Sequence, residues 1–431
     1  MPDKDRTSRP FWKALSAQYI GFMAAFQLLL WIPVFYEFQK RVGISGAKIL
    51  EIQSIYYLSF CFLEIPTGLF ADLFGRRLSV RVGAICFFLS NIAPGILVDG
   101  VIRNWGTDPT VSYAWMLTHF LLTASARSFI SGAFSAYFFE HLKKEGAVSE
   151  YAAMEARARV AGLASRVFGW AGIGFLMNFH LSLPYWLTAL GGVVALYFAF
   201  RLPPDVPGTL DAGPEKALAS VVARIRDAIQ DIREAPLLRI ALVLGVPIFV
   251  LDRVVFVNLF QPILTSKGID WKLAGTVLAV TACTEAIGAF QVKRIARLFA
   301  GRVRAYEWVL FLTLIESTFY GCLPLAGKTG TWVLLGLATL VGGVAMPFQK
   351  QAVNEAVLRP RVRATLISLE SLLERSVSAA AAWWLSRIFM QSGEAQGVPI
   401  FLMACAVGAW VWTAFLVGMR SLALRPRRAS R

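Results

Sequence analysis

Residues 64–77 read Glu64-Ile65-Pro66-Thr67-Gly68-Leu69-Phe70-Ala71-Asp72-Leu73-Phe74-Gly75-Arg76-Arg77, and they join two apolar blocks, at about 47–71 and 78–98. Gly68 and Gly75 lack a Cβ and so permit a sharp bend and close backbone approach. Asp72 can accept hydrogen bonds at a neighbouring helix N-terminus, while Arg76 and Arg77 can pair with acidic groups or lipid phosphates. We predict a tight charged turn between two membrane helices, able to hold one conformation and release it in another.

The apolar blocks continue along the whole chain on both sides of this turn. Of the 431 residues, 57% are hydrophobic and only 16% are charged, whereas soluble domains carry about 25% charged residues. Each block has roughly the twenty residues that a helix needs to cross the hydrocarbon core. The blocks lie at about 14–35, 47–71, 78–98, 113–139, 158–180, 183–200, 237–263, 272–292, 304–325, 331–352, 364–390 and 398–419. We therefore predict an all-α integral membrane protein with twelve transmembrane helices.

A polar gap divides the blocks into two sets of six. The prediction is an N-terminal six-helix half at 1–200, a cytoplasmic linker at 201–236 and a C-terminal six-helix half at 237–431. Within the linker, Leu218, Val222, Ile225, Ile229 and Ile232 recur at helical spacing. We expect an amphipathic helix there, lying along the membrane surface or against the helix bundle. Two-half symmetry of this kind is common in transporters, where the substrate path lies between the halves.

The net charge of +16 is explained by topology rather than by nucleic-acid binding. Lysines and arginines crowd into every second loop and both termini: Lys4, Arg6, Arg9, Lys13; Arg76, Arg77, Arg81; Lys143, Lys144; Lys293, Arg294, Arg297, Arg302, Arg304; Arg359, Arg361, Arg363; Arg425, Arg427, Arg428 and Arg431. Such alternation places both termini in the cytoplasm. We expect a multi-pass plasma-membrane protein, embedded in the lipid bilayer of a bacterial inner membrane.

The opening stretch resembles the loop 2–3 signature of the major facilitator superfamily, with Gly68, Asp72, Gly75, Arg76 and Arg77 on the motif positions. The lead-in from Glu64 to Gly68 is similar to that of a subgroup with E-x-P-T-G. Two further stretches are similar to that subgroup: Ser131-Gly132 with Phe139-Glu140 and Leu142-Lys143, and Arg363-Ala364-Thr365 with Ser368. The resemblance implies two pseudo-symmetric six-helix halves, alternating access, proton coupling and, by a small margin, export.

The resemblance has two departures. The equivalent turn in the second half has Val292 where an acid would sit, so a single latch is expected. The fifth block contains Gly169, Gly172 and Gly174 but lacks the Gly-Pro pair of drug antiporters, which weakens a drug-efflux function.

Charges inside the apolar blocks are the candidate substrate and coupling residues. Each costs at least about 2.5–3.5 kcal/mol to insert at mid-bilayer. Arg127, Asp252, Glu285 and Glu316 fall near the middle of their blocks, and Glu374 lies closer to the cytoplasm. Arg127 either binds an anionic substrate group or forms a structural ion pair.

The carboxylates have different expected roles. Asp252 and Glu374 are each followed by an arginine, which favours structural pairing over a role in the cavity. Glu285 and Glu316 have no such neighbour, and burial disfavours the charged form of a carboxylate. One of these two is therefore the expected coupling acid.

The leading functional hypothesis is a secondary active transporter of a small organic solute. The alternative is a non-transporting membrane receptor or assembly partner on the same scaffold, which predicts an interior emptied of charge. An enzyme is not expected, because the motifs of membrane proteases, hydrolases and nucleotide-binding enzymes are missing. Neither are a cofactor or a metal site expected, since the five cysteines and three histidines lack ligand spacing. A monomer is the default, and the sequence does not identify the substrate.

Overall fold

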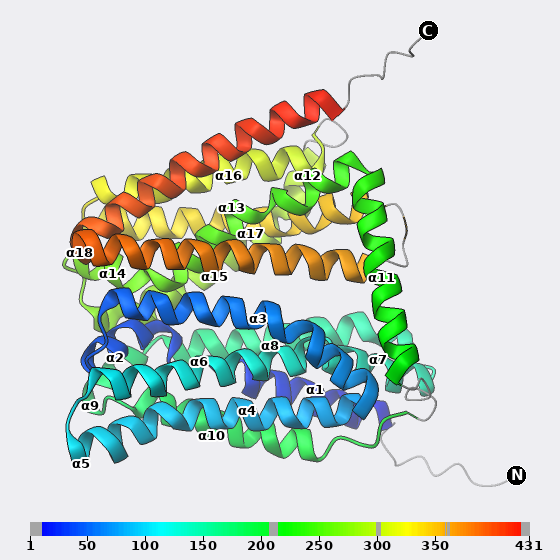
Figure 1. The fold of residues 1–431 in the computed structure, drawn as a ribbon, viewed down its shortest axis with the longest axis horizontal. Helices are drawn as coiled ribbons and strands as arrows, with labels where there is room; N and C mark the ends of the chain where they lie inside the picture. The colour runs from blue at the N-terminus through cyan, green and yellow to red at the C-terminus, as the bar shows by residue number, and fades with distance from the viewer. Residues whose placement is uncertain (1–10, 207–213, 299–302, 358, 360–362, 424–431) are drawn as a thin grey trace, which may run out of the picture. The chain divides into compact units, whose positions relative to one another are not determined.

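A computed structural model of the chain describes residues 11–206, 214–298, 303–357, 359 and 363–423 (Figure 1). These residues form helices joined by short connections, with no strand among them. The basic residues at 1–10 and 424–431, on which the cytoplasmic placement of the termini partly depends, lie outside the described residues. So do residues 299–302 of the second-half turn and the side chain of Leu218.

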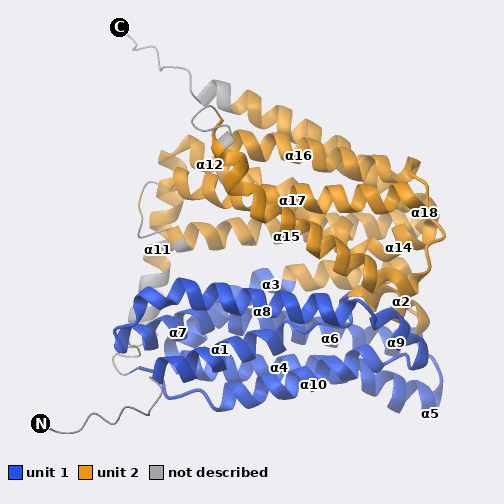
Figure 2. Cartoon of the chain, turned by 180° about the vertical axis from the view of Figure 1, so that it is seen from behind, with its two compact units in different colours: residues 1–32, 59–218 blue, residues 33–58, 219–431 orange. Residues whose placement is uncertain are grey.

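The chain forms two compact units (Figure 2). Unit 1 comprises Met1–Ile32 and Ser59–Leu218, and unit 2 comprises Pro33–Leu58 and Ala219–Arg431. Helix α3 (Gly46–Phe74) therefore begins in unit 2 and ends in unit 1. Residues 33–58, which we call the docked segment, pack with unit 2 although both flanking stretches of chain belong to unit 1.

Unit 1 is built around α4, which packs against α6 and α10, while α1 packs against α8 and α10. Its elements are α1 (Phe11–Phe26), α4 (Arg76–Ile96), η2 (Leu97–Ile102), α5 (Arg103–Trp105), α6 (Pro109–Ser131), α7 (Ala133–Lys144), η3 (Val148–Glu150), α8 (Tyr151–Trp170), α9 (Ile173–Phe179) and α10 (Leu183–Phe200). Aromatic rings fill its interior: Tyr19 stacks on Phe138 with centroids 4.4 Å apart, and Phe22 meets Phe134 edge-on at 4.6 Å. These rings fix how α1 and α7 face each other.

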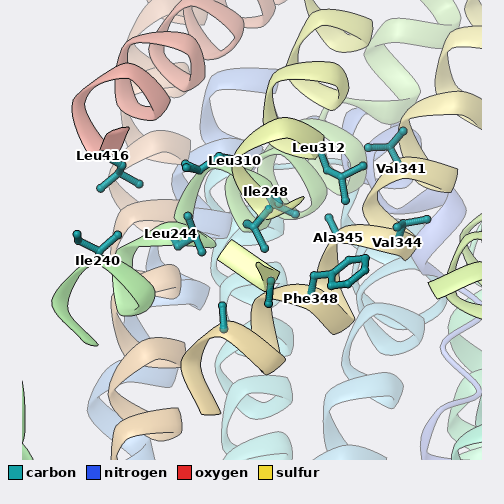
Figure 3. Close-up of a cluster of buried hydrophobic side chains, with 13 residues drawn as sticks. Ile240, Leu244, Ile248, Leu310, Leu312, Val341, Val344, Ala345, Phe348 and Leu416 are labelled. Atoms are coloured by element: carbon teal, nitrogen blue, oxygen red, sulfur yellow. The ribbon is translucent and has the colours of Figure 1, made fainter. Parts of the chain in front are cut away.

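Unit 2 is built around α17, which packs against α15 and α16, while α18 packs against α12, α13 and α16. Its elements are η1 (Ile32–Val34), α2 (Phe35–Arg41), α12 (Pro236–Leu244), α13 (Val246–Val250), η4 (Leu251–Asn258), α14 (Phe260–Ser266), η5 (Trp271–Leu273), α15 (Ala274–Leu298), α16 (Ala305–Cys322), η6 (Leu323–Leu325), α17 (Lys328–Ala356) and α18 (Arg363–Ala423). A buried apolar cluster from α12, α13, α16, α17 and α18, including Leu244, Ile248 and Phe348, holds these helices together (Figure 3).

Helices α15 and α17 cross with their backbones in close contact. A Cβ on Gly288 would overlap the Leu340 carbonyl, and one on Gly343 would overlap the Glu285 carbonyl. Beside this crossing, the hydroxyls of Thr284 and Thr339 are 2.7 Å apart. The glycines thus bring the chain around Glu285 directly against α17.

The linker contains helix α11 (Pro214–Glu234), which runs crosswise to α17 and α18 near their ends (Figure 1). Its Ala228 and Asp231 are buried, and Ala228 packs with Val353 and Leu366 of unit 2. Asp231 pairs with the side chain of Arg359 at 3.1 Å. This part of α11 is therefore tied to unit 2.

Eight helices among the described residues are long and apolar enough to cross a membrane, or nine if the pair Val148–Trp170 and Ile173–Phe179, bent by 49°, is one span. The predicted count of twelve stays a prediction. Helix α1 has only 16 residues, about 24 Å at 1.5 Å per residue, which is shorter than the hydrocarbon core. Conversely, α18 contains 61 residues and breaks at Gly393, where φ is 73°, because it comprises two helices.

Candidate functional site

Three acids predicted from the sequence come together in unit 2. Asp252 lies in η4, a π-helical segment, Glu285 on α15 and Glu316 on α16. All three interact electrostatically with one another. Single π-helical turns inside α-helices are frequent at functional sites, and here the π-helical segment carries Asp252. We call these three residues the carboxyl cluster.

Gly342 on α17 leaves the space in which two of the acids meet. A Cβ at Gly342 would lie 3.4 Å from Glu316 Oε1 and 3.5 Å from Asp252 Oδ1. Both carboxyl groups therefore converge on the same point of α17. The Asp252 and Glu316 carboxyl groups also interact electrostatically with each other, as expected for two acids that converge on one glycine.

Glu316 is fully buried, with 0% of its surface exposed. Among the described residues, no N–H or O–H group donates to either of its carboxyl oxygens. A carboxylate can only accept hydrogen bonds, so a hydrogen bond between two carboxyl groups requires a proton on one of them. Two ionised groups 4 Å apart would repel each other by about 4 kcal/mol at an effective dielectric constant of 20.

The exposed fraction of the side chains increases along the cluster. Glu316 is buried, Asp252 is partly exposed and Glu285 is exposed. Tyr320, one helical turn beyond Glu316 on α16, is also fully buried. Its hydroxyl oxygen has no hydrogen-bond partner among the described residues.

Glu374 belongs to a second polar cluster, formed by α17 and α18 of unit 2. Gln349 Nε2 donates to Glu370 Oε1 at 2.7 Å and to Glu374 Oε1 at 2.6 Å. Lys350 Nζ lies 3.0 Å from Glu370 Oε2. The amide of Gln349 packs so closely on Gly245 that a Cβ there would overlap it. These bonds are those expected of a structural role for Glu374.

Arg127 lies on α6 of unit 1 and is partly exposed. No hydrogen bond or ion pair joins it to any described residue. The structural ion pair that the sequence left open is therefore not formed within the described part of the chain, and Arg127 stays a candidate for binding an anionic group.

The opening stretch forms the predicted tight turn. Gly75 is the single residue between α3 and α4, with φ of 99°, a value that favours glycine. Arg76 pairs with Glu140 of α7, and the backbone N–H of Arg77 donates to Asp205 Oδ1 at 3.0 Å. These contacts anchor the turn within unit 1.

Gly68 and Asp72 of the turn lack the contacts that the sequence led us to expect among the described residues. Around Gly68, no described atom beyond its chain neighbours and its own helix backbone lies within 4 Å of where a Cβ would be, and the close backbone approach expected there stays a prediction. Asp72 is partly exposed, and no hydrogen bond or ion pair joins it to a described residue. The role of the turn as a conformational latch stays a prediction.

The docked segment is held to the rest of unit 2 by contacts between distant parts of the sequence. Gln261 Oε1 accepts from the backbone N–H of Tyr36 at 2.8 Å, and Lys40 pairs with Glu394 at 2.5 Å. The other bonds are Ser54 Oγ to the Ala379 carbonyl at 2.8 Å, Tyr57 Oη to the Arg253 carbonyl at 3.0 Å and Ser386 Oγ to the Ala47 carbonyl at 2.8 Å. The docking was not predicted from the sequence, because four of these five contacts engage a backbone N–H or carbonyl group, which carries no sequence signal, and because all of them join distant parts of the chain.

A helical chain with several membrane-spanning candidates and ionisable groups inside them defines a multi-pass membrane protein. The described residues contain no group of histidine, cysteine or acidic side chains placed to hold a metal ion. A family model of the Major Facilitator Superfamily matches residues 21–382. The chain therefore belongs to the Major Facilitator Superfamily, a family of transporters rather than enzymes.

Solved structures have the same fold at low sequence identity. The nucleoside transporter NupG has a TM-score of 0.70 at 14% identity, covering 94% of this chain and 98% of its own. A POT family transporter in complex with 5-aminolevulinic acid has a TM-score of 0.70 at 12% sequence identity, and the match covers 99% of both chains. A D-xylose–proton symporter has a TM-score of 0.65 at 15% sequence identity, and the match covers 94% of this chain and 98% of the symporter. A comparison with curated proteins gives no match. The E-x-P-T-G subgroup is not identified by these matches.

Proposed function

We propose that this protein is a proton-coupled secondary active transporter, which moves a small organic solute across the plasma membrane by alternating access. The observation that carries the proposal is the carboxyl cluster inside unit 2. Each charge placed in a membrane interior costs at least about 2.5–3.5 kcal/mol. Retaining three acids side by side is difficult to explain unless their protonation has a use.

This cluster also argues against the alternative, a non-transporting receptor on the same scaffold. A receptor has no need for acids in the membrane interior, and apolar residues at Asp252 and Glu316 would pack without a penalty for burying charge. The similar solved proteins named above include a nucleoside transporter and a D-xylose–proton symporter. Those names are consistent with a small polar solute and with protons.

The docked segment supports alternating access. Because it is covalently continuous with unit 1 at both ends and hydrogen-bonded within unit 2, a movement of one half against the other must either bend the chain where the segment joins unit 1 or release these contacts. The sequence carries Arg127 in its first half and carboxylates in its second, charges that suit a zwitterionic substrate, although an anion or a cation is nearly as compatible. We take export as the direction, on family resemblance, and cytoplasmic termini as the orientation, which the pattern of basic loops favours.

Thermal unfolding of the detergent-purified protein tests this function. A ligand that binds the native state raises the apparent stability by mass action. The panel contains amino acids, short peptides, nucleosides, sugars, organic anions and cationic drugs, each at two pH values. We expect stabilisation by one chemical class, with a loss of the shift in Arg127→Ala. Equal melting temperatures across a panel extended to lipid-like compounds would contradict a solute-transport function.

A further inference from the structure

Two buried polar groups of α16 have no hydrogen-bond partner among the described residues. They are the carboxyl group of Glu316 and the hydroxyl of Tyr320, and neither residue has any exposed surface. They lie four residues apart, on the same face of the helix. Buried polar groups without partners are costly and therefore require an explanation. The hydroxyl is a neutral group and so a separate observation from the three acids, and it interacts electrostatically with all of them.

We propose that Asp252 and Glu316 form a carboxyl pair that binds one proton between them, and that Glu285 is the entrance through which this proton exchanges with water. The inference rests on the proposed function, because it assigns the coupling proton of that transporter to two named side chains. Loading adds one H⁺ to two carboxylates and changes the charge of the pair from −2 to −1. Release reverses this step, with one O–H bond broken and one formed at each transfer.

The geometry around Gly342 supports a shared proton rather than two separate acids. Oxygens of both carboxyl groups lie within 3.5 Å of the point where a Gly342 Cβ would be. No described donor reaches Glu316, and a proton shared with Asp252 would supply its carboxyl group with a hydrogen bond. A pair of interacting acids loses its protons in steps that belong to the pair and not to either residue.

Few of the described charged groups act on Asp252 and Glu316 from the helices packed around them. Helix α16 packs against α12, α13, α17 and α18. Among the described residues, Asp252 and Glu285 are the charged groups that act on Glu316. Arg253, which follows Asp252 in η4, also acts on Asp252. No cationic side chain of the described residues is among the groups that act on Glu316, and a proton bound by the pair would neutralise one of its two charges.

Glu285 is placed to connect this pair with water. It is the exposed member of the carboxyl cluster, and Asp252 is intermediate in exposure. On this proposal, the proton passes from Glu285 to Asp252 and from there to the buried Glu316. Replacing Glu285 by glutamine should slow proton exchange at the pair without removing the proton.

Infrared spectroscopy of the purified full-length protein tests the pair directly, because the C=O stretch of a protonated carboxyl group is separate from that of a carboxylate. In difference spectra at neutral pH, Asp252→Asn and Glu316→Gln should each remove the same lowered C=O band of the shared proton, and the double variant should remove no more of that band. In Glu285→Gln the band should persist but shift several-fold more slowly after transfer to D₂O. Glu355→Gln, at an exposed position of α17, is the control and should change neither.

Two bands removed independently, one by each single variant, would overturn the shared proton, and so would unchanged spectra in both variants. If an amide variant does not fold, the frequency of the band in the wild-type protein still distinguishes a shared proton from an isolated acid. A carboxyl group bonded to a carboxylate has its C=O stretch lowered, whereas an isolated acid in apolar surroundings has it raised. None of these readings needs a substrate. A protein that shows the band but no solute-driven proton movement would refute the proposed function alone. A protein that shows solute-driven proton movement but no such band would refute the carboxyl pair alone.

Discussion

Gly342 and Gly343 are neighbours on α17, yet a side chain at each would meet different surroundings. At Gly342 the nearest atoms are carboxyl oxygens at 3.4 and 3.5 Å, ordinary contact distances. At Gly343 a methyl group would overlap the backbone carbonyl of Glu285, which no side-chain rotation can relieve.

We therefore expect Gly343→Ala to destabilise the protein by about 1–3 kcal/mol, the usual cost of overpacking. Gly342→Ala should leave the stability unchanged or raise it slightly, because alanine favours a helix more than glycine does. Thermal unfolding of both variants in the same detergent measures the difference. Equal stability of the two would show that α15 and α17 do not cross in close contact.

Single charged residues were the part of the site that sequence could predict. Asp252, Glu285 and Glu316 are visible because a charge inside an apolar block is costly. Their convergence at α17 could not be predicted from the sequence, because it depends on which faces of η4, α15 and α16 turn toward α17. Gly342 carries no charge and gave no signal, and Tyr320 resembled any interfacial aromatic residue.

Asp72 is the residue of the turn on which the predicted latch depends. We expect Asp72→Asn to impair transport, because the neutral amide cannot supply the charge that the latch needs, while membrane insertion stays intact. Transport and surface expression are measured in the same cells, with Asp108→Asn as the control. Asp108 caps α6 by accepting from the backbone N–H of Thr110, a structural task far from the turn. Unchanged transport in Asp72→Asn would remove the latch.

At the scale of elements, the docked segment offers a direct test of alternating access. Lys40 and Glu394 form an exposed ion pair. In a background without the five native cysteines, a disulfide between Lys40→Cys and Glu394→Cys should hold the segment on unit 2. Transport should then stop and return on reduction. A single Lys40→Cys variant controls for loss of the ion pair, and full transport by the cross-linked protein would contradict release of the segment.

Helix α11 provides a second test at this scale. Asp231 is buried and paired with Arg359, whereas Glu234, the other partner of Arg359, is largely exposed. A hydrogen bond to a charged group is worth about 1.5–3 kcal/mol, so Asp231→Asn should loosen α11 from unit 2. Limited proteolysis should cut within residues 219–235 several-fold faster than in the wild type. Glu234→Gln should change the rate little, and equal rates for both variants would argue against the docking of α11.

At the scale of the whole molecule, the helical membrane class was predictable because hydrophobic blocks of spanning length are explicit in the sequence. The family followed from the turn at residues 64–77. The partition into units was less accessible: residues 33–58 pack with unit 2 through contacts made with residues more than two hundred positions away, such as Gln261 and Glu394. Such pairings depend on tertiary structure and not on local pattern.

The central claim is that protons drive transport through the acids of unit 2. Its most direct test is proton movement in proteoliposomes that contain a pH-sensitive dye, on addition of the solute identified by thermal stabilisation. We predict solute-driven proton movement in the wild type and in Glu355→Gln, and none in Asp252→Asn or Glu316→Gln. Solute transport that is independent of the pH gradient and unchanged in both variants would contradict the account.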